Sequence, residues 1–238
     1  MSTSQSDKNY LIVGGTGGIG SALTQRVAET GANVFVVSRN APDDKIDGVT
    51  YLQADVLEGK LQLDELPDEL HGVAYCAGSI TLKPFNSLKD EDFLNDYKIN
   101  VLGAVHVLQG VMKHLRKSKD ASVVLFSTVA STVGMPYHAS IAAAKSAVEG
   151  LAKSLAAEWS KQNIRVNLVA PSITDTPMAE KLLDSEQKRE NSAERHPIQR
   201  IGQPEDMAAA AFFLLTDAPW MSGQVLGVDG GMSSLRML

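Results

Sequence analysis

The sequence is short of several features that mark particular classes of protein. Cys76 is the only cysteine in 238 residues, so no disulfide can form within the chain. No apolar run reaches the length of a membrane-spanning helix, and the N-terminus has no apolar signal core. Lys and Arg form no cluster and the net charge is −6, which argues against nucleic acid or an anionic membrane as the main partner. A cytoplasmic protein is the expectation.

No Pro/Ser-rich linker or abrupt shift in composition divides the chain, so we expect a single domain. It spans residues 8–238 and follows a polar, flexible tail of residues 1–7. The hydrophobic fraction of 44% is ordinary for a globular protein with a sizeable core.

Short apolar segments alternate with helix-like segments along the whole chain. Continuous Val, Ile, Leu and Ala runs are typical of strands buried on both faces of a parallel sheet. We predict strands at 10–13, 33–38, 50–53, 72–76, 122–127, 165–170 and 224–228, with longer helices at 92–116, 139–162 and 204–215. This alternation predicts a doubly wound α/β fold with about seven parallel strands.

A glycine-rich turn joins the first predicted strand to the first helix. Five glycines lie within residues 14–20. Gly15, Gly17 and Gly20 fit G-x-G-x-x-G, whereas Gly14, Gly18 and Gly20 fit G-x-x-x-G-x-G. Neither pattern is a Walker loop. Because the first N–H groups of a helix are unpaired, the turn is suited to a dinucleotide pyrophosphate. A flexible loop of small residues is the alternative.

The end of the second strand indicates which dinucleotide binds. An acidic side chain there would bond the ribose 2′-hydroxyl and repel a 2′-phosphate. This chain instead has Ser38 and Arg39, a hydroxyl and a guanidinium, and a guanidinium can hold a phosphate with two hydrogen bonds. NADP(H) is therefore favoured over NAD(H), the alternative being a solvated arginine. Asp55 and Val56, after the third strand, are expected at the adenine.

One charged segment, residues 174–202, interrupts the alternation. It carries an apolar stripe of Met178, Leu182 and Leu183. Ligands of such folds bind beyond the carboxyl ends of the strands, so this insertion is a candidate substrate lid. A solvated surface helix is the alternative for its charged face.

Several short motifs occur in a characteristic order from about residue 8 to 231. They are the glycine loop, Asp55-Val56, Ala77-Gly78, Asn100-Val101-Leu102-Gly103, Phe126-Ser127-Thr128, Lys145 with residues 146–151, Arg165-Val166-Asn167, Pro171, Gly223-Gln224 and Val228-Asp229-Gly230-Gly231. In this order the chain resembles a single-domain short-chain dehydrogenase/reductase, which implies a Rossmann-like fold. It also implies hydride transfer between a nicotinamide and a carbonyl or alcohol carbon, and a homodimer or homotetramer.

The resemblance implies a role for individual residues. Lys145 holds the nicotinamide ribose, Asn100 supports a proton path through water, and Thr128 takes the place of the serine that orients the substrate oxygen. The cofactor-binding residues expected are Gly14, Thr16, Gly18, Ile19, Gly20, Ser38, Arg39, Asp55, Val56, Ala77, Gly78, Lys145, Thr174 and Thr176.

The sequence departs from the family at the position of the catalytic tyrosine, four residues before the lysine. Ile141 stands there and cannot exchange a proton. Tyr137 and His138 lie eight and seven residues before Lys145, and on a continuous helix the offsets of four, seven and eight residues would share a face. Related enoyl reductases use a tyrosine seven residues before the lysine. Either side chain is a candidate general acid, and lining of the substrate pocket is the alternative for both.

Two further alternatives remain at this point. The first is a third candidate for the proton source, Thr128 with Lys145 and an ordered water. The second concerns the function: the chain is an NADP-binding sensor or scaffold that has lost catalysis, instead of an enzyme that acts on a small molecule. Ser172 also departs from the family, which has glycine after Pro171.

Other chemistry finds little support in the sequence. His71, His106, His114 and His196 show no metal-ligand spacing, so surface or packing roles are expected for them. No G-x-S-x-G elbow is present, and Cys76 ends a strand, where packing explains it. We therefore expect no metal.

Overall fold

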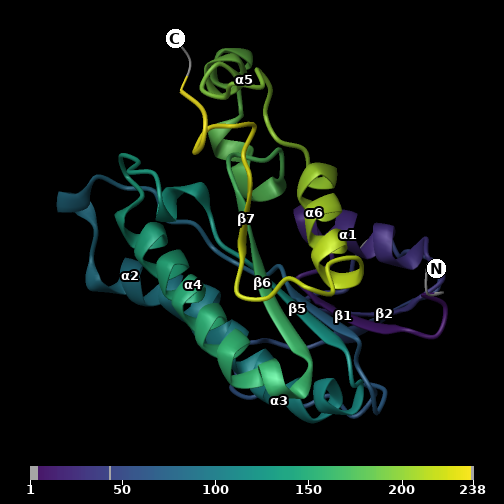
Figure 1. Ribbon diagram of the computed structural model, residues 1–238. Helices are drawn as coiled ribbons and strands as arrows, with labels where there is room; N and C mark the ends of the chain where they lie inside the picture. Colours follow the sequence, from purple (N-terminus) through teal and green to yellow (C-terminus); the bar gives the residue numbers. More distant parts are fainter. Residues whose placement is uncertain (1–4, 43, 237–238) are drawn as a thin grey trace.

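The computed structural model describes residues 5–42 and 44–236, so residues 1–4 of the expected tail lie outside the described part. Seven parallel strands form one sheet in the order β3-β2-β1-β4-β5-β6-β7 (Figure 1). The strands are β1 (Asn9–Val13), β2 (Asn33–Ser38), β3 (Val49–Gln53), β4 (Gly72–Tyr75), β5 (Ala121–Phe126), β6 (Ile164–Pro171) and β7 (Val225–Val228).

The predicted fold class is confirmed, and every predicted strand is present with ends that differ by one residue at most. The strands could be predicted because strands of a parallel sheet are buried on both faces and are therefore continuous apolar runs. All residues of β4 and β5 are buried, because helices cover both faces of the sheet. The strand order reverses between β1 and β4, which opens a crevice at their carboxyl ends.

The helices form one layer on each face of the sheet (Figure 1). They are α1 (Gly18–Ala28), α2 (Asp90–Tyr97), α3 (Gly103–Lys117), α4 (Ala139–Trp159), α5 (Glu186–Ala193) and α6 (Pro204–Thr216). Leu23 of α1 and Leu214 of α6 belong to one hydrophobic core, whereas Leu108 of α3 and Val148 of α4 belong to another. Within the described residues, no helix is both long and apolar enough to cross a membrane.

The single helix predicted at 92–116 is interrupted, and this expectation was wrong in detail. A π-helical segment, Lys98–Leu102, separates α2 from α3. The hydroxyl of Tyr75 donates a 2.6 Å hydrogen bond to the Ile99 carbonyl, which in a regular α-helix would accept from Gly103. The Gly103 N–H bonds the Lys98 carbonyl instead. A side chain inserted into the helical hydrogen-bond ladder thus widens the turn that contains Asn100.

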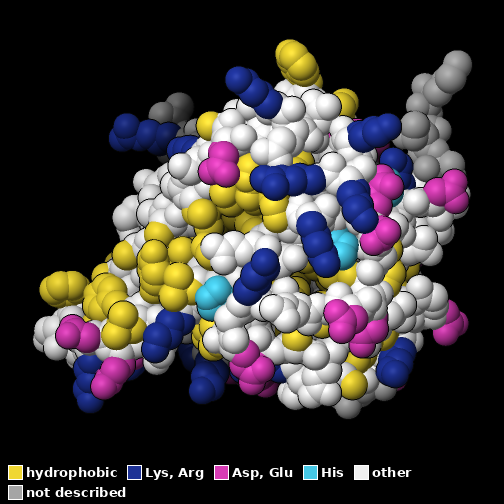
Figure 2. Space-filling view, turned by 90° about the horizontal axis from the view of Figure 1, so that it is seen from below, with side chains coloured by type: hydrophobic (Ala, Val, Ile, Leu, Met, Phe, Trp, Pro, Cys, Tyr) yellow, Lys and Arg dark blue, Asp and Glu magenta, His cyan; other side chains and the backbone are white. Residues whose placement is uncertain are grey.

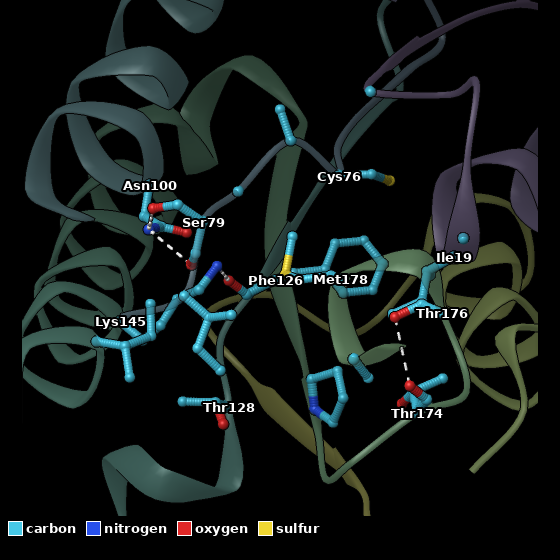
Figure 3. A pocket seen from close by; sticks show the side chains of 18 of the residues that line it. Ile19, Cys76, Ser79, Asn100, Phe126, Thr128, Lys145, Thr174, Thr176 and Met178 are labelled. Carbon is cyan, nitrogen blue, oxygen red and sulfur yellow. Dashed lines mark hydrogen bonds between the residues drawn. The ribbon is translucent and has the colours of Figure 1, made fainter. Parts of the chain in front are cut away.

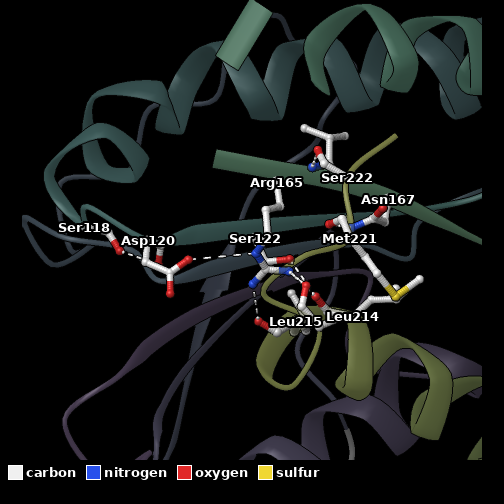
Figure 4. Close-up of polar contacts among 11 residues, drawn as sticks. Ser118, Asp120, Ser122, Arg165, Asn167, Leu214, Leu215, Met221 and Ser222 are labelled. Atoms are coloured by element: carbon white, nitrogen blue, oxygen red, sulfur yellow. Dashed lines mark hydrogen bonds and ion pairs between the residues drawn. The ribbon is translucent and has the colours of Figure 1, made fainter. Parts of the chain in front are cut away.

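Arg165 of β6 fastens α6 to the sheet (Figure 4). Its Nη1 donates hydrogen bonds of 2.9 Å to the carbonyls of Leu214 and Ala218, and Nη2 donates to Leu215 at 3.3 Å. A guanidinium at this place satisfies the unpaired last carbonyls of the helix and complements the negative end of its dipole.

Residues 174–202 fold over the carboxyl edge of the sheet. They contain a 3₁₀ segment, Pro177–Leu182, and then α5. Arg189 is paired with Asp175 through contacts of 2.6 and 3.1 Å, and a bridge from Thr174 to Gly202 brings the two ends of the segment together. Leu183 is buried, while the side chain of Met178 remains half exposed.

Candidate active site

A cavity of about 1020 Å³ lies at the carboxyl ends of the strands, at the upper end of the range of about 300–1,000 Å³ for ligand pockets. Figure 3 shows part of its wall. The wall brings together every residue that the sequence predicted for the site: Gly14, Thr16, Gly18, Ile19, Gly20, Ser38, Arg39, Asp55, Val56, Ala77, Gly78, Asn100, Thr128, Tyr137, His138, Lys145, Thr174 and Thr176.

Two positions of the glycine loop, Gly14 and Gly20, leave no room for a side chain or require a backbone conformation that favours glycine. A Cβ on Gly20 would lie 2.1 Å from the Gly14 carbonyl oxygen, and Gly14 itself has a φ of +78°. A Cβ on Gly17 would meet nothing within 4 Å. The loop is therefore closely packed behind and open toward the cavity, where α1 begins. This arrangement fits a pyrophosphate at the helix N-terminus.

The end of β2 carries a basic side chain, Arg39, into the cavity wall. The Ser38 hydroxyl donates to the Asn40 carbonyl at 2.6 Å. The exposed guanidinium of Arg39 has no hydrogen bond or ion pair with any described residue. Asp55 accepts a hydrogen bond from the Leu57 N–H at 2.9 Å, and Val56 is largely buried beside it. Arg39 is thus unengaged and available to an anion.

The opposite wall is formed by the start of segment 174–202. Thr176 Oγ1 donates to the Thr174 carbonyl at 3.3 Å, and Thr174 Oγ1 donates to the Ser172 carbonyl at 3.0 Å (Figure 3). A Cβ on Gly18 would touch the Thr176 methyl at 3.1 Å. The glycine loop and this segment therefore lie against each other at one end of the cavity.

Lys145 lies on α4, and its Nζ donates a 2.9 Å hydrogen bond to the Phe126 carbonyl (Figure 3). Burial lowers the pKa of Lys145 from 10.5 to about 8, while the charges of Cys76 and Asp96 act in the opposite direction. Burial raises the pKa of the Cys76 thiol to about 12. Cys76 is therefore an unreactive thiol in the cavity wall.

Asn100 is buried in the π-helical turn beside Lys145 (Figure 3). Its Nδ2 donates to the Asp96 carbonyl at 2.9 Å and to Ser79 Oγ at 3.2 Å. Its Oδ1 is buried without a hydrogen-bond partner in the described part of the chain. Ser79 in turn donates to the buried Asp96 carboxylate at 2.8 Å. The unsatisfied Oδ1 leaves an acceptor for a water or ligand donor.

Thr128 caps a short 3₁₀ segment, Val129–Ser131, at the end of β5. Its Oγ1 accepts from the Ala130 N–H at 3.3 Å, which leaves its hydroxyl proton for another partner. The loop is fixed from behind by Glu149 of α4, whose Oε1 accepts from Ser127 and Ser131 at 2.5 Å. Glu149 and Lys145 both belong to α4, so the helix that carries Lys145 also fixes the loop that holds Thr128.

A matched family model and a curated relative decide the family. The model described as enoyl-(acyl carrier protein) reductase matches residues 14–233. A 3-oxoacyl-(acyl-carrier-protein) reductase of Thermotoga maritima is 33% identical over 244 residues, which cover 94% of this chain and 97% of that protein. The chain is a short-chain dehydrogenase/reductase.

Solved structures of this family have the same fold. A putative 2-deoxy-D-gluconate 3-dehydrogenase from Agrobacterium tumefaciens with bound NADP has a TM-score of 0.89 at 28% identity, covering 98% of this chain and 100% of that one. Ligand-free aldohexose dehydrogenase from Thermoplasma acidophilum has a TM-score of 0.86 at 26% identity, covering 98% and 96%.

In this short-chain dehydrogenase/reductase, Ile141 lies one helical turn before Lys145, is 3% exposed and lines the cavity. Tyr137 also lines the cavity, but it is 59% exposed and has a φ of +69°. His138 is half-buried, and its Nδ1 lies 2.7 Å from the Pro136 carbonyl of the same loop. The two sequence-predicted proton donors thus occupy the rim.

Ser172 and His196 are among the residues of the cavity wall that the sequence interpretation missed. His196 was expected on the surface or in packing; it is buried, with 3% of its surface exposed, and its Nε2 lies 2.8 Å from Ser172 Oγ. The available signal was Ser172 itself, a hydroxyl where the family pattern has glycine. His196 gave none, because it approaches only through the folding of residues 174–202.

Proposed function

We propose that this short-chain dehydrogenase/reductase is an NADP(H)-dependent oxidoreductase that interconverts a carbonyl and an alcohol, or reduces an activated double bond, in a small molecule. The observation that carries the proposal is one cavity that holds the glycine loop, the unengaged Arg39 and the buried Lys145. NADP-bound relatives with the same fold support the choice of cofactor.

The residues present fit the cofactor. The glycine loop and the first turn of α1 hold the pyrophosphate, and Ser38 with Arg39 holds the 2′-phosphate. Asp55 and Val56 hold the adenine, and Lys145 with Thr174 and Thr176 holds the nicotinamide end. The bound cofactor supplies or accepts the hydride. Ala77 and Gly78 form the floor between these parts.

The remaining roles belong to the chain's own side chains. Thr128 orients the substrate oxygen with the hydroxyl proton that its cap leaves unused. Asn100 offers Oδ1 to a water on the proton path. Ile141 cannot supply the proton, and Tyr137 and His138 at the rim are the candidate donors that the sequence predicted. Met178 covers the cavity from segment 174–202, which acts as the substrate lid.

The test follows NADPH absorbance with ethyl acetoacetate, benzaldehyde and cyclohexenone as probes. Wild type is compared with Tyr137→Phe, His138→Ala and Ile141→Tyr. Turnover by the wild type supports an enzyme, and its loss in Tyr137→Phe or His138→Ala identifies the donor. If only Ile141→Tyr turns over, the protein is an NADP-binding sensor or scaffold, a second candidate function that buried Ile141 favours.

We further propose a homodimer or homotetramer formed through the helices around α2 and α4. Phe85, Leu94 and Tyr97 are 76%, 52% and 43% exposed. Figure 2 shows hydrophobic side chains gathered on the side where α2 lies in Figure 1, while basic and acidic side chains are interspersed elsewhere on that face. Light scattering after size-exclusion chromatography tests this, and a monomer that persists at high concentration contradicts it.

A further inference from the structure

A serine and a buried histidine also line the cavity and contact each other. Ser172 follows β6 at the carboxyl edge of the sheet, and His196 follows α5. Both line the cavity, and His196 Nε2 lies 2.8 Å from Ser172 Oγ. The other ring nitrogen, Nδ1, lies 2.8 Å from the Ser192 carbonyl. The imidazole therefore joins a backbone acceptor to a hydroxyl in the cavity.

The partners of the ring fix its tautomer. A carbonyl oxygen only accepts hydrogen bonds, so Nδ1 carries a proton and donates a hydrogen bond to the Ser192 carbonyl. In the neutral ring Nε2 then has a lone pair and accepts the hydroxyl proton of Ser172. This is the arrangement of a hydroxyl beside an oriented base.

The same partners also satisfy the protonated ring. Nε2–H then donates to Ser172 Oγ, and the Ser172 proton is free to turn elsewhere. Met232 Sδ lies 3.3 Å from Ser172 Oγ, and sulfur is a weak acceptor that a substrate oxygen readily displaces. Both protonation states of His196 therefore have complete hydrogen bonding without movement of the chain.

No other described histidine has this environment. His106, His114 and His138 each meet a backbone carbonyl through Nδ1, and His71 pairs with Glu69. Within residues 5–42 and 44–236, only His196 joins its ring to a side-chain hydroxyl, and that hydroxyl lines the cavity.

The sheet register brings Ser172 to the same edge of the sheet as Thr128, the residue proposed to orient the substrate oxygen. Phe126 of β5 pairs with Val169 of β6, so Thr128 and Ser172 follow the ends of neighbouring strands. Thr128 lies two residues beyond Phe126 and Ser172 three beyond Val169. Both hydroxyls therefore stand at the same edge of the sheet and face the same cavity.

We propose that Ser172 is a catalytic residue and that His196, acting through it, completes a proton relay that replaces the missing tyrosine. The inference rests on the proposed function. In carbonyl reduction, the carbon receives a hydride from the reduced nicotinamide cofactor and the π electron pair moves to the oxygen. That oxygen takes the Ser172 hydroxyl proton while Ser172 takes the Nε2 proton, which leaves neutral His196. Solvent then reprotonates the ring, and alcohol oxidation runs the same transfers in reverse.

The first test needs no cofactor or substrate. Nitrogen-15 NMR of the histidine rings in the full chain is expected to show neutral His196 as the Nδ1–H tautomer. Ser172→Ala is expected to shift its Nε2 resonance and leave the His114 resonances unchanged. His114 is a matched control because it is also buried, with Nδ1 2.6 Å from the Pro67 carbonyl. A neutral His196 ring with its proton on Nε2 instead of Nδ1 overturns the relay.

The second test is kinetic and uses the same three probes with NADPH. Ser172→Ala and His196→Gln are expected to lower kcat about 100-fold or more, with little change in KM or in NADPH affinity. Glutamine keeps a hydrogen bond to Ser172 but cannot exchange the proton. In His196→Ala, added imidazole is expected to restore part of kcat, which a purely structural role would not produce. Ser122→Ala and His114→Gln are the matched controls for folding.

The outcomes separate the two proposals. Wild-type turnover that survives in Ser172→Ala and His196→Gln overturns the relay and leaves the proposed function standing. Loss confined to Tyr137→Phe or His138→Ala also overturns the relay, leaves the proposed function standing and assigns the proton to the rim. A wild type without turnover on any probe overturns the proposed function and the relay with it.

Discussion

The phenolic oxygen of Tyr75 lies 2.6 Å from the carbonyl oxygen of Ile99, to which it donates its proton. Burial raises the pKa of Tyr75 above its ordinary value, so the hydroxyl stays protonated and keeps this bond. The bond holds open the π-helical turn from which Asn100 reaches the cavity. A strand residue thereby sets the shape of a helix that follows it by more than twenty positions.

Tyr75→Phe is expected to lower the free energy of unfolding by about 1–3 kcal/mol, because the Ile99 carbonyl loses its buried donor. Urea unfolding measures this. Tyr97→Phe is the matched control, since Tyr97 is 43% exposed. Equal midpoints for the two variants would contradict the role assigned to the Tyr75 hydroxyl.

NADPH affinity is expected to fall by about tenfold as pH rises through about 8, because Lys145 loses its charge there and with it a charged hydrogen bond. Lys145→Met is expected to bind more weakly and to lack this step. Fluorescence titration between pH 6.5 and about 9.5 covers the step. If NADPH affinity depends on pH in the same way in the two proteins, Lys145 does not hold the cofactor ribose.

The same lysine affects stability with the opposite sign. Its pKa is lowered from 10.5 to about 8 in the folded chain, so the unfolded chain binds more protons between these values. This group therefore adds stability as pH rises through that window. Relative to Lys145→Met, the wild type is expected to gain thermal stability from pH 8 to 10, and a loss would contradict the lowered pKa.

Arg39→Ala is expected to weaken NADPH binding by about 10- to 100-fold, because a charged hydrogen bond to phosphate contributes about 1.5–3 kcal/mol. NADH binding is expected to change little, since it lacks the 2′-phosphate. Isothermal titration with both cofactors measures the difference. If wild type and variant bind both cofactors equally well, Arg39 is only a solvated arginine and the choice of NADP(H) fails.

Gly20→Ala is expected to lower thermal stability strongly and to abolish NADPH binding, because its Cβ would lie 2.1 Å from the Gly14 carbonyl oxygen. Gly17→Ala is the control within the same loop, since its Cβ would meet nothing within 4 Å. We expect that variant to melt close to the wild-type temperature. Similar losses in both variants would show that loop flexibility, rather than close packing, requires the glycines.

The sequence predicted the sheet and the gathering of the site because both depend on local patterns. Buried parallel strands are continuous apolar runs, and their carboxyl ends share one edge, so residues that follow strands meet there. Thr128 and Arg39 lie in the cavity for this reason. The π-helical turn and the Ser172–His196 contact were not predictable, because each depends on a side chain from a separate element whose approach no periodicity encodes.

The two hydrophobic cores on opposite faces of the sheet have an evolutionary consequence. The helix behind the glycine loop packs through Leu23 and Val27 into one core, and the helix that carries Lys145 packs through Val148 and Ala152 into the other. Selection can therefore alter residues around position 141 without disturbing the support of the phosphate loop. A lineage with this architecture is free to change its reaction while it keeps its nucleotide.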